Sequence, residues 1–138
     1  GLVLPPQPPL QLGQCLIHLR FNYRGVVVGR DPACKMSESW IRANGVDSLR
    51  HGRKQPFYYV LTDIRDRPGA PVNYVAHELV MVDTPPEPLM HPLTSDYFTT
   101  FDQPTGRFLP TPALLERYPA AAPALATGTP EADESDSA

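Results

Sequence analysis

The sequence predicts a small, mainly β domain in which a few short strands form a curled sheet or a barrel. Three observations predict it: short runs of β-forming residues, turn residues between those runs, and only one clear internal helix pattern. A chain of 138 residues has room for one core. Because closing a small sheet on itself removes its exposed edges, a barrel is the expected form.

The expected strands alternate with turns along the first two thirds of the chain. They are "QCLIHLRF" (14–21), "VVVGRD" (26–31), "QPFYYVLTDI" (55–64) and "VNYVAHELVMVD" (72–83), the last being one strand or a pair. Gly25 suits the turn before the second strand, and Gly29 favours a bulge or a close backbone approach inside it.

One short helix is expected at "SESWIRANG" (37–45). Ser37 is a suitable N-cap, and Gly45 can take the left-handed conformation that ends a helix. Trp40 and Ile41 are its expected buried contacts. A helix of about two turns is not stable alone in water, so it must pack on the sheet.

The chain after Asp83 is expected to form short helices that pack on the outside of the barrel. Tyr97, Phe98 and Phe101 are spaced to share one helical face. Thr111 and Pro112 mark the start of a second short helix, as a cap and a first helical residue.

Composition divides the chain into four parts. They are a proline-rich linker (1–11), the barrel domain (12–83), a C-terminal extension (84–119) and a disordered acidic tail (120–138). Residues 12–83 carry ten Lys or Arg and seven Asp or Glu, a local charge of +3, whereas residues 84–138 carry two and eight, a charge of −6. The mildly basic domain and the acidic remainder therefore have to be considered separately.

The chain is expected to be intracellular, in a nucleus or a cytoplasm that the sequence does not distinguish. Two cysteines, Cys15 and Cys34, make no disulfide framework. No apolar run approaches the roughly 18 residues of a membrane span. The first residue is Gly1 rather than Met, so we expect a fragment or a processed product.

Several blocks of the sequence resemble a known family. "GVVVGRDPAC", "W", "GRKQPFYYVL" and "YVAHE" occur in this order over roughly half of the chain, which thereby resembles the YccV-like, or hemimethylated DNA-binding, domain of HspQ-type proteins. The run "HPLTSDYFTTFDQPTGRFLPTPALLERYP" (91–119) extends the resemblance to the C-terminal domain of F-box proteins of the F-box-only-21 type. The resemblance implies a small SH3-like β-barrel with one inserted helix, DNA as a partner, and no enzyme activity.

One position departs from the pattern of that family. The family usually reads Glu-Asn-Leu in the last strand, whereas Glu78 is followed directly by Leu79 here. Because the loss of one residue in a strand reverses the face of every later side chain, the resemblance does not fix the orientation of Leu79 and Met81.

Metal binding and catalysis are not expected, and neither is a cofactor. Cys15 and His18 have a Cys-x-x-His spacing, but strand positions three apart point to opposite faces. No second close pair of ligands follows, as a structural zinc site needs, so we expect core thiols and a surface histidine. No strained nucleophile turn and no phosphate-loop glycine pattern is present.

The loop "DSLRHGRK" (47–54) is the candidate nucleic-acid site. Arginine forks and backbone N–H groups beside a glycine are suited to phosphate oxygens. The candidate contact residues are Arg42, Arg50, His51, Arg53 and Lys54. Three further arginines (Arg20, Arg24 and Arg30) extend this patch if the barrel brings them together. The alternative is a loop that only keeps the sheet soluble.

The aromatic residues offer a competing use in protein recognition. Phe57, Tyr58 and Tyr59 are consecutive, so we expect Phe57 and Tyr59 on one face and Tyr58 on the other, turned outward. Exposed Tyr58 and half-buried Trp40 are the candidate partner-binding residues.

Two functions therefore stay open. The first is a DNA-binding module that contacts phosphates through the basic loop. The second is a protein-recognition module that presents client proteins, as in an F-box subunit of a ubiquitin ligase or a protease-linked factor.

Overall fold

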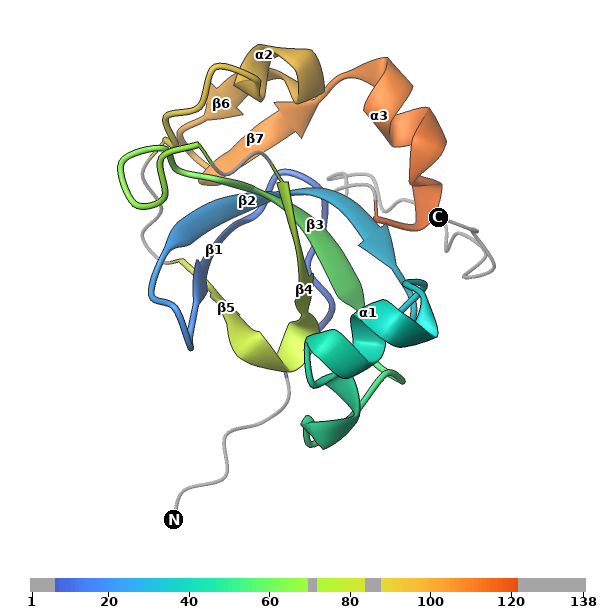
Figure 1. Cartoon of the computed structure of the whole chain (residues 1–138). Helices are drawn as coiled ribbons and strands as arrows, with labels where there is room; N and C mark the ends of the chain where they lie inside the picture. The colour runs from blue at the N-terminus through green and yellow to red at the C-terminus, as the bar shows by residue number, and fades with distance from the viewer. Residues whose placement is uncertain (1–6, 70–71, 84–87, 122–138) are drawn as a thin grey trace.

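A curled antiparallel sheet forms the centre of the computed structural model, which describes residues 7–69, 72–83 and 88–121 (Figure 1). The sheet has five strands in the order β4-β3-β2-β1-β5. Their bounds are β1 (Cys15–His18), β2 (Arg24–Asp31), β3 (Phe57–Thr62), β4 (Val72–Ala76) and β5 (Val80–Val82). The mainly β fold class is confirmed. Within the described residues the two edge strands, β4 and β5, do not pair with each other but follow one another through the 3₁₀ turn η2 (His77–Leu79).

The turn η2 lies where the sequence departs from the family pattern. Glu78 and Leu79, between which the family has an extra residue, are both in this turn rather than in a strand. The expected strand over 72–83 is therefore a pair, β4 and β5. Met81 of β5 points outward and is exposed, while its neighbour Val80 is buried.

One apolar core covers both faces of the central strands. Consecutive residues of β2 and β3 point to opposite faces, and pairs such as Val26 and Val27 or Val60 and Leu61 are buried on both. The largest fully buried members of the core include Leu10, Leu12, Leu16, Tyr23, Val26, Val27, Tyr58, Val60 and Leu61. The register of β2 against β3 shifts between Val27 and Gly29, which confirms the expected bulge. A Cβ at Gly29 would lie 2.9 Å from the rings of Tyr59 and Tyr118, so only glycine fits there.

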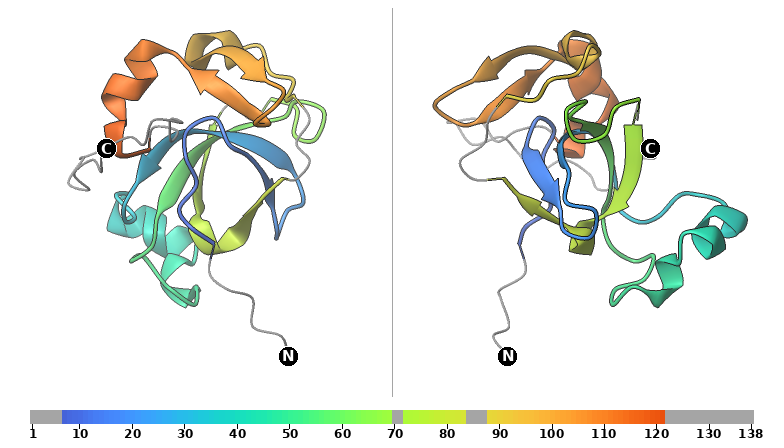
Figure 2. Two further views of the ribbon diagram at one scale, coloured as in Figure 1. Left: turned by 180° about the vertical axis from the view of Figure 1, so that it is seen from behind. Right: turned by 60° about the vertical axis from the view of Figure 1, so that its left-hand side comes forward.

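The expected helix is present as α1 (Glu38–Ala43), followed by the 3₁₀ turn η1 (Val46–Ser48). The Ser37 hydroxyl accepts a hydrogen bond from the Trp40 N–H at 3.2 Å, and Gly45 has a left-handed φ of 64°. Together α1 and η1 form an insertion between β2 and β3 that stands out beside the sheet (Figure 2). A small second core, with Ile41, Val46, Phe57 and Ala76 as its buried members, attaches the insertion to β3 and β4.

The chain after residue 88 crosses the curled sheet as a hairpin with short helices (Figures 1 and 2). Its elements are α2 (Thr94–Tyr97), β6 (Phe98–Asp102), β7 (Arg107–Pro110), α3 (Pro112–Arg117) and η3 (Pro119–Ala121). The start of α3 is as expected, since the Thr111 hydroxyl accepts from the Leu114 N–H at 3.3 Å.

The expectation that Tyr97, Phe98 and Phe101 share a helical face is wrong. Phe98 and Phe101 belong to strand β6, which pairs with β7 and has a register shift between Phe98 and Thr100. The extra residue of this bulge brings positions three apart to the same face, and both rings contact Phe108, at centroid distances of 5.1 and 4.9 Å. A bulged strand therefore reproduces a spacing that is typical of a helix.

The N-terminal and C-terminal parts of the described chain meet at the core. The Leu12 N–H donates to the Ala121 carbonyl at 2.8 Å, and Leu10 is fully buried. Of the segments assigned from composition, residues 1–6 of the linker and 122–138 of the acidic tail lie outside the described residues. Across 7–69, 72–83 and 88–121, no helix has the length and apolar character that crossing a membrane requires.

Candidate functional site

The guanidinium of Arg53, a central member of the candidate basic loop, is occupied by two carboxylates. Its N–H groups donate to Asp47 at 3.1 and 2.7 Å and to Glu38 at 2.7 and 3.2 Å. These hydrogen bonds hold the pKa values of Asp47 and Glu38 below their ordinary range. Arg53 therefore links α1 to η1, and its guanidinium group is not free to bind a phosphate.

The backbone of the same loop is also occupied. The N–H groups of Arg50 and His51 donate to the Glu78 carboxylate at 3.0 and 2.8 Å, and the Gln55 amide donates to it at 2.8 Å. Burial alone would raise the pKa of Glu78, but the hydrogen bonds from His51, Gln55 and Arg50 keep it below its ordinary value. The N–H groups beside Gly52 thus already bind an anion, the side chain of Glu78.

The remaining candidate contact residues face solvent. Arg42, Arg50, His51 and Lys54 are exposed, and within the part of the chain that the structure describes no ion pair involves them. The expected extension of this patch does not occur. Arg24 pairs with Asp83 at 2.9 Å, and Arg30 is buried with its guanidinium donating to the Leu10 carbonyl at 3.2 Å.

The expected exposure of Tyr58 is wrong. Phe57 and Tyr59 do share one face, where both rings contact Tyr74, but Tyr58 points into the core and its side chain is fully buried. Its hydroxyl accepts from the Leu10 N–H at 2.9 Å and shares a hydrogen bond of 2.6 Å with Nδ1 of His77. Both faces of β3 are covered. The inner face lies against the core of the curled sheet, and the outer face is covered by the α1–η1 insertion at Phe57 and by Tyr118 near Tyr59, so Tyr58 is not available to a partner.

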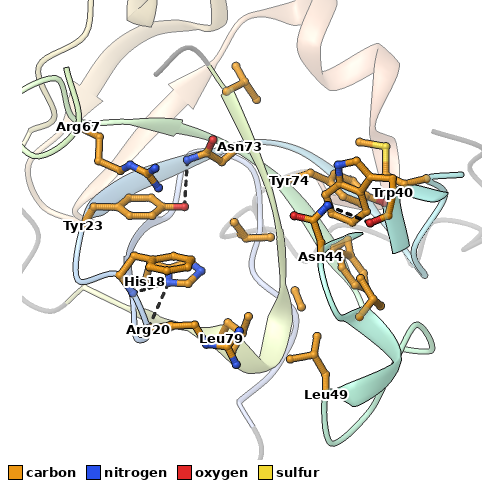
Figure 3. A pocket seen from close by; sticks show the side chains of 17 residues that line it. His18, Arg20, Tyr23, Trp40, Asn44, Leu49, Arg67, Asn73, Tyr74 and Leu79 are labelled. Atoms are coloured by element: carbon orange, nitrogen blue, oxygen red, sulfur yellow. Dashed lines mark hydrogen bonds between the residues drawn. The ribbon is translucent and has the colours of Figure 1, made fainter. Parts of the chain in front are cut away.

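A groove lies between the β1–β2 hairpin and the α1–η1 insertion, with β4 between them (Figure 3). Its volume is about 470 Å³. One end has polar and cationic residues, His18, Arg20, Tyr23 and Arg67, and the other has Trp40, Asn44, Leu49 and Tyr74. Every residue of β4 contributes to the lining. Residues from distant parts of the sequence therefore meet here.

His18 organises the polar end of the groove. Its ring stacks on Phe21 and Tyr23, each at a centroid distance of 5.0 Å. Its Nδ1 accepts the backbone N–H groups of Arg20 at 3.2 Å and Phe21 at 3.1 Å, so the proton of the neutral ring lies on Nε2. Burial, with the nearby charges of Arg20 and Arg67, lowers the pKa of His18 to about 4. The expectation of a surface histidine is wrong for His18, because the two aromatic rings cover it.

Aromatic rings, and no carboxylate among the described lining residues, surround the cations at this end of the groove. The guanidinium carbon of Arg67 lies over the rings of Tyr23, 5.1 Å from the centroid, and of Phe21, 5.9 Å away. Asn73 donates to the Tyr23 hydroxyl at 3.3 Å. Arg20 and Arg67 are the charged members of the groove lining, and no aspartate or glutamate lies among the described residues that form it.

The aromatic end is built by Tyr74 and Trp40. The Trp40 ring meets the Tyr74 ring edge-on, with centroids 5.6 Å apart. The Tyr74 hydroxyl donates to buried Asp31 at 2.7 Å and accepts from the Lys35 N–H at 3.1 Å, which ties the insertion to the sheet. Trp40 is half-buried and lines the groove.

No sequence pattern indicated this groove. Its cations, Arg20 and Arg67, stand far apart in the sequence, and neither belongs to a run of basic residues. The buried state of His18 depends on rings that only the β1–β2 hairpin brings onto it. As for metals, no three His, Cys, Asp or Glu side chains cluster in a way that could hold an ion within residues 7–69, 72–83 and 88–121.

Comparison with known proteins finds a family and a set of relatives. The family model described as hemimethylated DNA-binding protein YccV like matches residues 9–105. Proteins named F-box only protein 21 from Homo sapiens, Mus musculus and Pongo abelii are each 37% identical to the chain over 109 residues. That alignment covers 78% of this chain and 16% of each relative, so the chain spans about a sixth of the length of these relatives.

Proposed function

The chain belongs to the YccV-like family, and we propose that it is a non-catalytic recognition module whose groove binds a segment of another protein. The groove between the β1–β2 hairpin and the α1–η1 insertion is the observation that carries this proposal. It combines aromatic, aliphatic and arginine side chains, a composition typical of the centre of protein interfaces.

The rim of the groove supports a role in binding. Phe21 is 63% exposed and Leu19 is 54% exposed, at the tip of the hairpin that forms one wall. Large apolar side chains gathered beside a concave site are a mark of interaction surfaces. The opposite wall offers the half-buried ring of Trp40.

The relatives indicate the setting in which such a module would act. They are named F-box only protein 21, and the chain corresponds to a small part of them. We propose that this part recognises client proteins for a ubiquitin-ligase subunit of the F-box type, inside the cell. The free thiols of Cys15 and Cys34 agree with a reducing compartment.

DNA binding is the second candidate function, and one observation favours it beyond the description of the family. Arg42, Arg50 and Lys54 are exposed and form no ion pair with any residue that the structure describes, and phosphate oxygens are suitable acceptors for them. Against it, Arg53 and the backbone of the loop already bind Glu38, Asp47 and Glu78.

An affinity-capture experiment tests the protein-recognition proposal. The 138-residue chain is immobilised, exposed to a nuclease-treated cell lysate and compared with Trp40→Ala and with Arg42→Ala, a truncation of the same helix outside the groove. We expect Trp40→Ala to lose a defined set of proteins that the wild type and Arg42→Ala retain, while all three unfold cooperatively. A captured set that is unchanged by Trp40→Ala would refute the proposal.

A titration with duplex DNA tests the second candidate. Short hemimethylated and unmethylated duplexes are added to the chain at about 50 and 200 mM salt. If DNA is the ligand, binding weakens steeply with salt, and Arg50→Ala and Lys54→Ala each reduce the slope by about one. Binding that is absent, or indifferent to salt, would eliminate phosphate recognition by this loop.

A further inference from the structure

Strand β4 forms an open edge of the sheet within the groove. It pairs with β3 on one side, and no described strand pairs with its other side. Exposed edges are usually protected by proline, lysine or a covering element, and neither residue type occurs in β4, "VNYVA". All five of its residues line the groove.

The register shows which backbone groups point away from β3. The His77 N–H donates to the Pro56 carbonyl at 2.9 Å, and Phe57 lies opposite Ala76. Because hydrogen-bonded and non-hydrogen-bonded pairs alternate in an antiparallel ladder, Asn73 and Val75 face β3 with their backbone groups. The N–H and C=O groups of Val72, Tyr74 and Ala76 therefore point toward the groove.

The side chains of β4 divide the groove into two walls with different chemistry. Asn73 and Val75 lie on the face of Tyr23 and His18, beside the cationic end. Tyr74 and Ala76 lie on the face of the insertion, beside the aromatic end. A strand added to β4 would direct its alternate side chains to the same two walls, since the side-chain period of a strand is two.

The charges that line the groove indicate which kind of ligand it can bind. Arg20 and Arg67 carry the charge of the cationic wall, which has no carboxylate among the described residues that line it. The aromatic wall has Trp40 and Leu49. A ligand that is complementary to both walls has acidic residues on one side and apolar or aromatic residues on the other.

We infer that the groove binds an extended acidic peptide, which adds as a strand to the free edge of β4 and alternates Asp or Glu with apolar residues. This inference rests on the proposed function, because it specifies the protein segment that the module recognises. A peptide backbone satisfies the N–H and C=O groups of Val72, Tyr74 and Ala76, as in other cases of strand addition. A nucleic acid has no such alternating backbone donors and acceptors, and two arginines are a small cationic footprint for it.

The test uses a defined probe, an acetylated and amidated octapeptide that alternates glutamate with valine or tyrosine. Binding to the 138-residue chain is followed by fluorescence anisotropy, and amide hydrogen exchange is followed by NMR. We expect exchange at the Tyr74 and Ala76 amides to slow at least about tenfold on saturation, because these amides become hydrogen-bonded. The Val75 amide, already paired with β3, serves as the internal control.

Matched variants distinguish a specific contribution of the groove arginines from a general effect of the charge of the protein. Arg20→Glu is expected to weaken peptide binding at least about tenfold, whereas Arg42→Glu, the same charge change outside the groove, leaves it unchanged. A peptide with lysine in place of glutamate, and one with N-methylated backbone groups, are both expected not to bind. Tyr74 and Ala76 amides that stay unprotected at saturation, or equal losses in Arg20→Glu and Arg42→Glu, would overturn the inference. So would protection of the same amides by an oligonucleotide and not by the peptide.

The outcomes distinguish this inference from the proposed function. If Trp40-dependent protein capture persists but the octapeptide gives no protection at β4, strand addition is wrong and protein recognition stands. If capture does not depend on Trp40 and the octapeptide does not bind, both are wrong.

Discussion

Two arginine-bearing regions of the molecule differ in the surroundings of their charges. In the loop of residues 50–54 the cations are adjacent in sequence, but the fold brings Glu38, Asp47 and Glu78 against the loop. At the cationic end of the groove, Arg20 and Arg67 come from separate turns, and the lining there has no carboxylate among the described residues. The density of basic residues along a sequence is thus a poor measure of the charge that a partner meets, because distant acids neutralise it.

The two regions also contain different titratable groups. The groove end is built on a buried neutral histidine, His18, whereas the loop is built on ionised carboxylates with lowered pKa values. As the pH falls, protonation should therefore destabilise the groove end first and the loop only at lower pH. The predictions below use this difference, beginning with the largest effect.

The largest expected effect is a loss of stability in mild acid that depends on His18. Its folded-state pKa of about 4 lies below its unfolded value, so protonation favours unfolding, and stability is lost as the pH falls through 6.5 toward 4. The free energy of unfolding should fall by about 2 kcal/mol between pH 7 and pH 5 from this group. Urea unfolding at several pH values measures it. His77, whose pKa is also lowered, adds in the same direction.

The control is His18→Asn, which keeps a side-chain acceptor for the hairpin N–H groups and removes the titration. The variant should be less stable at pH 7 but show a flatter pH dependence above pH 5. An unchanged pH dependence would show that His18 is not a buried neutral group in the groove end. The groove end and the loop would then not differ in the way their stability responds to acid.

A smaller effect is expected from Glu78→Gln in the loop. The change keeps the size of the side chain, but one oxygen becomes an NH₂ group that cannot accept from the N–H groups of Arg50 or His51. Loss of a charged acceptor should lower the free energy of unfolding by about 1 to 2 kcal/mol. The Oε1 atom accepts from both His51 and Gln55, whereas Oε2 accepts only from Arg50, so the new NH₂ group should replace Oε2. Urea unfolding at pH 7 measures the loss, and faster exchange of the Arg50 amide should accompany it. Wild-type stability with an unchanged Arg50 amide would show that the loop does not depend on this carboxylate.

The smallest effect is expected from Arg53→Ala. The Arg53 pairs with Glu38 and Asp47 are at the surface, where ion pairs contribute little and are screened by salt. The loss of stability should be smaller than that of Glu78→Gln and should diminish as salt is added. DNA affinity, if any, should not fall, because the guanidinium is already occupied. A clear fall in DNA affinity with Arg53→Ala would instead show that the loop exchanges its carboxylates for phosphates.

Local features of the fold were predictable where the responsible residues are neighbours in the sequence. Ser37 caps α1, Gly45 takes a positive φ, and Gly29 marks the bulge of β2, each as expected. The β6–β7 hairpin was not predicted. The spacing of Phe98 and Phe101 is compatible with a helix and with a bulged strand, and only pairing with β7 decides between them.

The candidate site was predicted only in part, because side-chain exposure depends on what packs against each face. The alternation of Phe57, Tyr58 and Tyr59 was correct, but the face assigned to solvent is the interior of the curled sheet. Trp40 was expected in the core or at its margin, since an aromatic residue on a short helix must pack on the sheet, and the structure shows it half-buried. The partners of Arg53 could not be foreseen, since Glu38 and Asp47 reach it only when α1 and η1 fold together.

The sequence by itself determined the mainly β class, the position of the inserted helix and the family, because strand alternation, caps and turn residues act between near neighbours. The tertiary structure alone decided which arginines are neutralised, that His18 is buried and uncharged, and that β4 leaves an open edge beside Arg20 and Arg67. The physical reason is that charge, burial and free hydrogen-bonding groups are set by distances in space. Those distances follow from the packing of the insertion and the hairpin around the sheet.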